Sequence, residues 1–163
     1  MKEEIIKEEI QRLIMYVKRN PAEQNGEETV DLLSLFKGSN DAGDCIASYK
    51  KIYDVSIPIW QSTMDYLHIM AKEENMLKVL EEYEEDMVRV IQYIDDSRNE
   101  IIEALLRDNA EEMKVFRPSK VSGVLFDYSG GQPEYSFYVE SNEEYHFHIY
   151  IRDDMSFDAG DIS

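Results

Sequence analysis

The sequence predicts an α+β fold in which helices occupy residues 1–114 and a three-stranded antiparallel β-meander follows in residues 115–152, packed on the helices. Two observations predict this class. Apolar residues recur at intervals of three and four through most of the first part, as on one face of a helix. Near Val115 the interval changes to two, as in a strand with one buried face. We expect residues 1–163 to form one domain, with an acidic, loop-like tail at 153–163.

The helical part is predicted to begin with a helix at Lys2–Arg19, which Asn20-Pro21 ends. Shorter helices are expected near residues 27–36, 42–53 and 58–72. The dominant element is one long amphipathic helix over residues 75–113, with a break allowed near Asp96-Ser97. Its apolar stripe is expected to pack in the core. Because its spacing approaches a heptad repeat, pairing of two copies along this helix is the alternative.

The three strands are predicted at residues 121–128, 134–140 and 145–151, joined by turns at 129–133 and 141–143. These turn lengths would place Phe137 opposite Phe126 on one side and opposite Phe147 on the other. The face expected to pack on the helices carries Val124, Phe126, Tyr128, Tyr135, Phe137, Val139, Tyr145, Phe147, Ile149 and Ile151. The opposite, more polar face carries Leu125, Asp127, Ser136, Tyr138, His146, His148, Tyr150 and Arg152.

Charge is the strongest functional signal, because 35 Asp and Glu residues stand against 17 Lys and Arg, for a net charge of −18. Such a charge repels nucleic acid and anionic membranes and attracts basic surfaces. Residues 72–113 hold half of it, with 14 acids and 5 bases. On a single helix these acids would recur about every 4.5 Å, close to the phosphate spacing of about 3.4 Å along a DNA strand. A solvated helix face is the simpler explanation.

Candidate metal ligands are sparse. His146 and His148 would share one strand face with Asp127 nearby, and Asp65-x-x-His68 would place two ligands on one helix face. A zinc site needs three or four protein ligands, and His68 is the only histidine in the sequence besides His146 and His148. Nucleophile and phosphate-binding motifs are absent from the sequence. We therefore expect no metal, no cofactor and no catalytic activity.

These observations predict a non-enzymatic acidic binding protein that inhibits or masks a basic protein, such as a nuclease or another enzyme acting on nucleic acid, as a DNA mimic would. The predicted contact residues are Glu81, Glu82, Glu84, Glu85, Asp86, Asp95, Asp96, Tyr138, His146, His148 and Tyr150. A compact acidic chain whose helices lead into a β-meander is similar in composition to bacterial immunity proteins and phage inhibitors. That resemblance implies the same role.

Two other functions remain open from the sequence. The chain could be an assembly protein that homo-oligomerises through the long helix, or a small metal-binding or enzymatic domain that uses the polar sheet face. The charged N-terminal residues lack the apolar core of a signal peptide, and no apolar run reaches the ~20 residues that span a bilayer. A cytoplasmic location is therefore expected.

Overall fold

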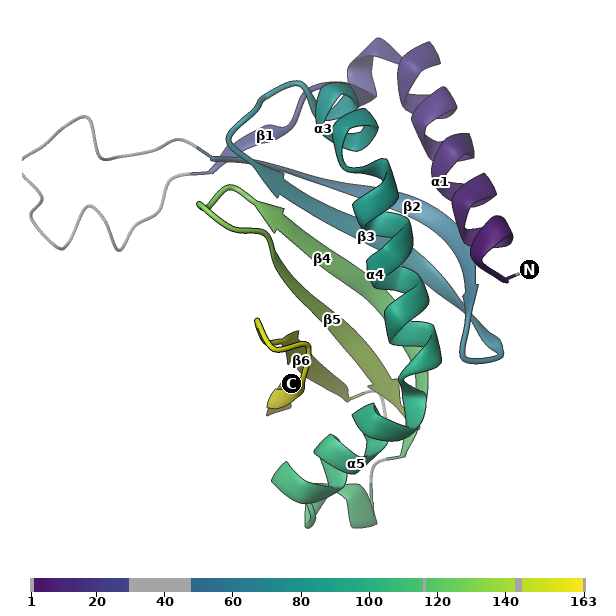
Figure 1. The fold of residues 1–163 in the computed structure, drawn as a ribbon, viewed down its shortest axis with the longest axis vertical. Helices are drawn as coiled ribbons and strands as arrows, with labels where there is room; N and C mark the ends of the chain where they lie inside the picture. The colour runs from purple at the N-terminus through teal and green to yellow at the C-terminus, as the bar shows by residue number, and fades with distance from the viewer. Residues whose placement is uncertain (1, 30–47, 116, 143–144, 163) are drawn as a thin grey trace, which may run out of the picture.

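The computed structural model describes residues 2–29, 48–115, 117–142 and 145–162. Its described part is an α+β fold in which the helices lie against one face of a seven-stranded mixed sheet (Figure 1). The strand order is β1-β2-β3-β4-β5-β6-β7, and every neighbouring pair is antiparallel except β3 and β4. The α+β class is confirmed. The predicted architecture is wrong, because the sheet is far larger than a three-stranded meander and the helices are short.

The first helix, α1 (Lys2–Arg19), has the predicted bounds. Its buried residues are Ile6, Ile10, Leu13, Ile14 and Val17, which form the stripe expected of an amphipathic helix. A 3₁₀ turn, η1 (Pro21–Glu23), follows it and leads to the short strand β1 (Glu27–Thr29). The predicted helix at 27–36 therefore begins as a strand, and its residues 30–36 lie outside the described part of the chain.

Two long strands, β2 (Ser48–Ile59) and β3 (Ser62–Ala71), occupy the region predicted as two helices. In β2 the odd-numbered Tyr53, Ile57 and Ile59 are buried, and the even-numbered residues between them are more exposed. This alternation is that of a strand and not of a helix. The predicted helices at 42–53 and 58–72 are thus wrong over the described residues, whereas residues 42–47 lie outside them.

The hairpin between β2 and β3 turns at Trp60-Gln61, both with positive φ, 54° and 62°. Trp60 is fixed there because its indole N–H donates to the Ile94 carbonyl oxygen at 3.0 Å and its backbone N–H donates to Asp95 Oδ1 at 2.8 Å. A turn of this kind normally uses Asn or Gly, which tolerate positive φ. The buried tryptophan anchors the turn to α4 instead.

Gln61 is exposed and makes the same turn without such an anchor. Replacing Gln61 with glycine is expected to raise the free energy of unfolding by about 0.5–1 kcal/mol, because glycine adopts positive φ without a steric cost. Urea denaturation measures the difference. Ser62→Gly, one residue later in β3, is the control and should lower stability by a similar amount. A loss of stability in Gln61→Gly would contradict the described turn.

The predicted long helix is three helices, α3 (Met76–Glu82), α4 (Glu84–Asp96) and α5 (Arg98–Asp108), each joined to the next by one residue. The joining residues have bent backbones, with φ and ψ of −106° and 16° at Tyr83 and −102° and 22° at Ser97. Together the helices form the crossover that allows β3 and β4 to run parallel. Their apolar stripe, which includes Leu80, Met87, Ile91, Ile94, Ile101 and Leu105, is buried within the same chain.

Because of these bends, the three helices follow the twisted sheet from one end to the other (Figure 1). At one end α3 contacts β3, and at the other α5 contacts β7. Helix α1 packs against both α3 and α4. A short 3₁₀ turn, η2 (Glu112–Lys114), follows α5. Among the helices of the described residues, none combines the length and the apolar character needed to cross a membrane.

The meander consists of β4 (Pro118–Tyr128), β5 (Glu134–Ser141), β6 (His146–Ile151) and β7 (Phe157–Ile162). The first three strands lie where they were predicted, and β7 replaces most of the predicted loop-like tail. The predicted register is wrong by two residues, because Phe137 lies opposite Val124 and Ile149. An error of two residues keeps every side chain on its predicted face. Of the face expected to pack on the helices, Tyr135 and Ile151 are half-buried, and Tyr145, which precedes β6, is 44% exposed.

Candidate partner-binding surfaces

Four carboxylates surround the residue that joins α3 to α4. Glu81 and Glu82 end α3, and Glu84 and Glu85 begin α4. Glu81, Glu82 and Glu85 are exposed and Glu84 is half-buried. Between them, the ring of Tyr83 turns inward and stacks on Tyr128, with 3.8 Å between ring centroids and 6° between planes. We call these four glutamates the acidic junction. Within the described residues, none of the four has a cation within 4.0 Å.

The acidic junction lies where two helix dipoles meet. The amino-terminal end of α4 favours the negative charge of Glu84 and Glu85, whereas the carboxyl-terminal end of α3 disfavours that of Glu81 and Glu82. Like charges this close on a helix cost a few tenths of a kcal/mol per pair. The acidic junction therefore holds a concentrated negative charge that no ion pair among the described residues neutralises.

Asp86, the next acid, is used inside the fold. Its Oδ2 accepts hydrogen bonds from the hydroxyls of Tyr128, at 2.8 Å, and Tyr135, at 2.6 Å, and its Oδ1 pairs with Arg89. Burial alone would raise the pKa of Asp86, but the hydrogen bonds from Tyr135, Arg89 and Tyr128 outweigh it and hold this pKa below its ordinary value. Burial, and then the charge of Asp86, raises the pKa of Tyr128. Asp86 therefore ties α4 to β4 and β5.

Asp95 also makes contacts within the fold. Its Oδ1 accepts a hydrogen bond from the Trp60 backbone N–H and forms an ion pair with Lys2 Nζ at 2.9 Å. Its side chain is only 8% exposed. Asp96 is exposed and accepts a hydrogen bond from Gln92 at 2.9 Å. Of the seven acids predicted to contact a partner, the acidic junction and Asp96 therefore remain on the surface.

The predicted aromatic residues form a band on the opposite face of the sheet. His148 lies between Tyr138 and Tyr150, with 4.3 Å between its ring centroid and each of theirs. His146 Nε2 lies 3.6 Å from Glu140 Oε1. A Cβ atom at Gly160 would lie 2.8 Å from the Tyr150 ring, so the glycine allows the close approach of that ring. The band is thus held by packing along the sheet surface.

The two predicted groups are not brought together. The buried Phe137, Val139 and Phe147 point to the helices, so their neighbours Tyr138 and His148 point away from them. The acidic junction stands on the helical side of the molecule and the aromatic band on the other. One compact partner surface does not contain both.

The candidate metal ligands do not form one metal-binding group among the described residues. Asp65 and His68 lie on β3 and not on a helix, and Asp65 pairs with Lys120 Nζ at 2.6 Å. Asp127 Oδ1 accepts from the backbone N–H of Ser129. Burial lowers the pKa of His68, as does the charge of Lys50, whereas Asp127 opposes this shift. In the part of the chain that the structure describes, no group of three or more His, Cys, Asp or Glu residues is placed to hold a metal.

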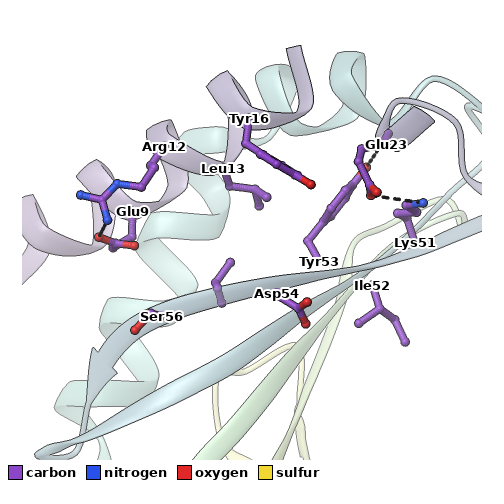
Figure 2. A pocket seen from close by; sticks show the side chains of 11 residues that line it. Glu9, Arg12, Leu13, Tyr16, Glu23, Lys51, Ile52, Tyr53, Asp54 and Ser56 are labelled. Atoms are coloured by element: carbon purple, nitrogen blue, oxygen red, sulfur yellow. Dashed lines mark hydrogen bonds and ion pairs between the residues drawn. The ribbon is translucent and has the colours of Figure 1, made fainter. Parts of the chain in front are cut away.

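A groove of about 670 Å³ between α1 and β2 went unpredicted (Figure 2). Leu13 and Tyr16 from α1 and Tyr53 and Val55 from β2 contribute to its walls. The Tyr53 hydroxyl donates to the Glu23 carbonyl oxygen at 2.6 Å, and burial raises the pKa of Tyr53. The alternation of apolar residues in β2 was the only sequence signal for this groove. It was missed because residues 42–53 and 58–72 were interpreted as helices, with only residues 55–57 between them expected to be extended or a turn.

Comparison of the chain with protein-family models, with curated proteins and with solved structures finds no match.

Proposed function

We propose that this chain is a non-enzymatic acidic binding protein that masks a basic surface of a protein partner, with the acidic junction at the centre of the contact. The observation that supports the proposal is the set of four glutamates within residues 81–85, which have no cation partner among the described residues. A partner that brings lysine or arginine side chains to this point relieves their mutual repulsion on binding.

The partner class follows from the same charge. At the rise of a helix, residues 81–85 span about 6 Å, which is about the length that holds two phosphates of a DNA strand. A surface that binds phosphates, as in a nuclease or another nucleic-acid enzyme, has the complementary charge. The net charge of −18 also raises the rate of association with such a basic surface. This rate falls as the salt concentration rises, because salt screens the charges.

The bends between the three helices limit the mimicry. A single straight helix would have offered its acids in one long row, but the chain changes direction at Tyr83 and Ser97. Asp86 and Asp95 are also withdrawn into the fold. The proposed contact is therefore compact, and the aromatic band on the far side of the sheet takes no part in it.

Affinity capture from lysate of the source cells tests this proposal. The tagged protein is compared with a variant that carries Glu81→Lys, Glu82→Lys and Glu85→Lys, three exposed positions. Wild-type protein is expected to retain a basic nucleic-acid enzyme at about 0.15 M salt and to release it as salt rises, because screening weakens exposed charge pairs. The reversed variant is expected to retain none.

The control variant carries Glu100→Lys, Glu103→Lys and Asp153→Lys, which change the net charge equally at exposed positions away from the acidic junction. It should retain the partner as wild type does. Equal capture by the reversed variant, or equal loss in both variants, would contradict a contact at the acidic junction.

A further inference from the structure

Among the described residues, one edge of the sheet has no strand partner along most of β2. In the described part of the chain, β1 pairs with β2 only at residues 48–50, and residues 51–59 pair with β3 alone. The chain leaves this edge at Gly26, whose N–H donates to the Glu74 carbonyl oxygen at 2.9 Å. The next residue back, Asn25, forms its bridge with Asn75 instead of with β2. Alternate residues of β2 beyond Lys50 therefore direct backbone N–H and C=O groups away from β3.

The groove of about 670 Å³ runs beside this edge (Figure 2). Tyr53 projects from β2 toward Leu13 and Tyr16 of α1 (Figure 2), and Val55 also lines the groove. Tyr16 is 54% exposed. A strand laid along β2 would direct every second side chain into this partly apolar groove. It would direct the others to the opposite side of the sheet, beside the even-numbered residues of β2.

Those even-numbered residues have their own chemistry. Ile52 is 57% exposed, and Asp54 and Ser56 are exposed as well. The acids in the groove are already paired, Glu9 with Arg12 at 2.8 Å and Glu23 with Lys51 at 3.4 Å. Asp54, on the side of β2 opposite to Tyr53 and Val55, has no cation within 4.0 Å among the described residues. Charge complementarity therefore places a basic side chain beside Asp54.

We infer that the open edge of β2 binds an extended segment of a partner protein, which pairs with residues 51–55 as an added strand. In the partner segment, the side chains that face Tyr16 and Val55 are apolar, and the alternate side chains, which face Asp54, are basic. The strand stops near residue 55, because β2 is bulged between Asp54 and Ile57 and because Pro58 has no N–H to donate.

A second copy of this chain is the less suitable occupant. Two copies joined at their β2 edges would bring together molecules that each carry a net charge of −18. The open edge belongs to β2, which α1 contacts, whereas the acidic junction belongs to α3 and α4, which α1 also contacts. Binding at residues 51–55 therefore does not depend on whether the acidic junction binds a partner.

A synthetic peptide of alternating lysine and valine residues, about eight residues long, tests the inference by titration into the ¹⁵N-labelled protein at about 0.15 M salt. Amide shifts are expected to be largest at residues 51–55 and beside Tyr16. The same peptide N-methylated at every residue keeps its charge and side chains but has no N–H to donate, and it should bind at least 10-fold more weakly.

Asp54→Lys is expected to weaken binding of the lysine–valine peptide about 10-fold, and Asp153→Lys, with the same net charge, less than 2-fold. Any of four results would overturn the inference: shifts centred on the acidic junction, equal binding of the N-methylated peptide, no binding at millimolar peptide, or shifts at residues 51–55 that depend on protein concentration alone. The last of these would identify a second copy as the occupant.

Discussion

Replacing Asp86 with alanine is expected to lower the free energy of unfolding by about 2–4 kcal/mol. The hydroxyls of Tyr128 and Tyr135 both donate to Asp86 Oδ2, and Arg89 pairs with Oδ1. Removing the carboxylate leaves two phenol groups, one of them on a buried residue, without an acceptor. Each such group costs about 1–3 kcal/mol, and bonds to a charged acceptor are the stronger kind.

Urea denaturation of purified protein measures this loss. Asp96→Ala is the matched control, because Asp96 belongs to the same helix, is exposed and accepts only from Gln92 in the described hydrogen bonds. It should change stability by less than about 0.5 kcal/mol. Equal effects at the two positions would show that Asp86 is a surface charge and not a link between α4 and the sheet.

The same cluster makes stability depend on pH in a defined direction. The pKa of Asp86 is lower in the fold than its ordinary value, so its contribution is complete above about pH 4 and is lost as pH falls through the folded value. The pKa of Tyr128 is raised, so its contribution is complete below about pH 10 and is lost at higher pH. Asp86→Asn should therefore lose less stability than wild type between pH 5 and about pH 2.5.

Phe137→Ala is expected to cost about 3–5 kcal/mol, the range for removing a fully buried aromatic side chain. Phe137 is completely buried, and its ring meets that of Phe157 edge-on at 6.1 Å between centroids. The loss combines the transfer of the ring from the core and the cavity that it leaves.

Tyr150→Ala is the matched control for the other face of the sheet, because Tyr150 is 41% exposed and lies on the adjoining strand. Its removal should cost about 1 kcal/mol or less, since the residue is exposed and its ring packs on His148 on the surface of the sheet. Thermal and urea denaturation of both variants measure the difference. Similar losses at both positions would mean that both faces of the sheet are covered.

The sequence predicted α1 and the meander because each had an uninterrupted period and a clear end. In α1 the stripe ends at Asn20-Pro21, and in the meander the alternation is broken by Gly130-Gly131. The faces of the strands were predicted correctly and their register was not, because loop length cannot be deduced from alternation alone.

The β2–β3 hairpin was missed for a physical reason. Its turn is formed by Trp60-Gln61, which carries none of the usual turn residues and is held by contacts to Ile94 and Asp95 some 35 residues away. Pro58 indicated an extended or turn conformation at residues 55–57, but the residues from Pro58 onward were still interpreted as a helix. Tertiary contacts, which no local pattern shows, decided this element.

Tertiary contacts also determine which of the candidate acids are exposed. Glu85 and Asp86 are neighbours in a run of acids, yet one is exposed and the other accepts two tyrosine hydroxyls. Composition predicted the excess of charge. Only the positions of Tyr128 and Tyr135 on β4 and β5 determine which carboxylates remain for a partner.

The most direct test of the proposed function is the affinity of the captured partner, measured by calorimetry at about 0.15 M salt for wild type and for the variant with Glu81→Lys, Glu82→Lys and Glu85→Lys. We expect the variant to bind about 100-fold more weakly, which corresponds to the loss of about 1 kcal/mol at each of three positions. The control with Glu100→Lys, Glu103→Lys and Asp153→Lys should stay within about 3-fold of wild type. An unchanged affinity of the first variant would contradict the proposal that the acidic junction binds the partner.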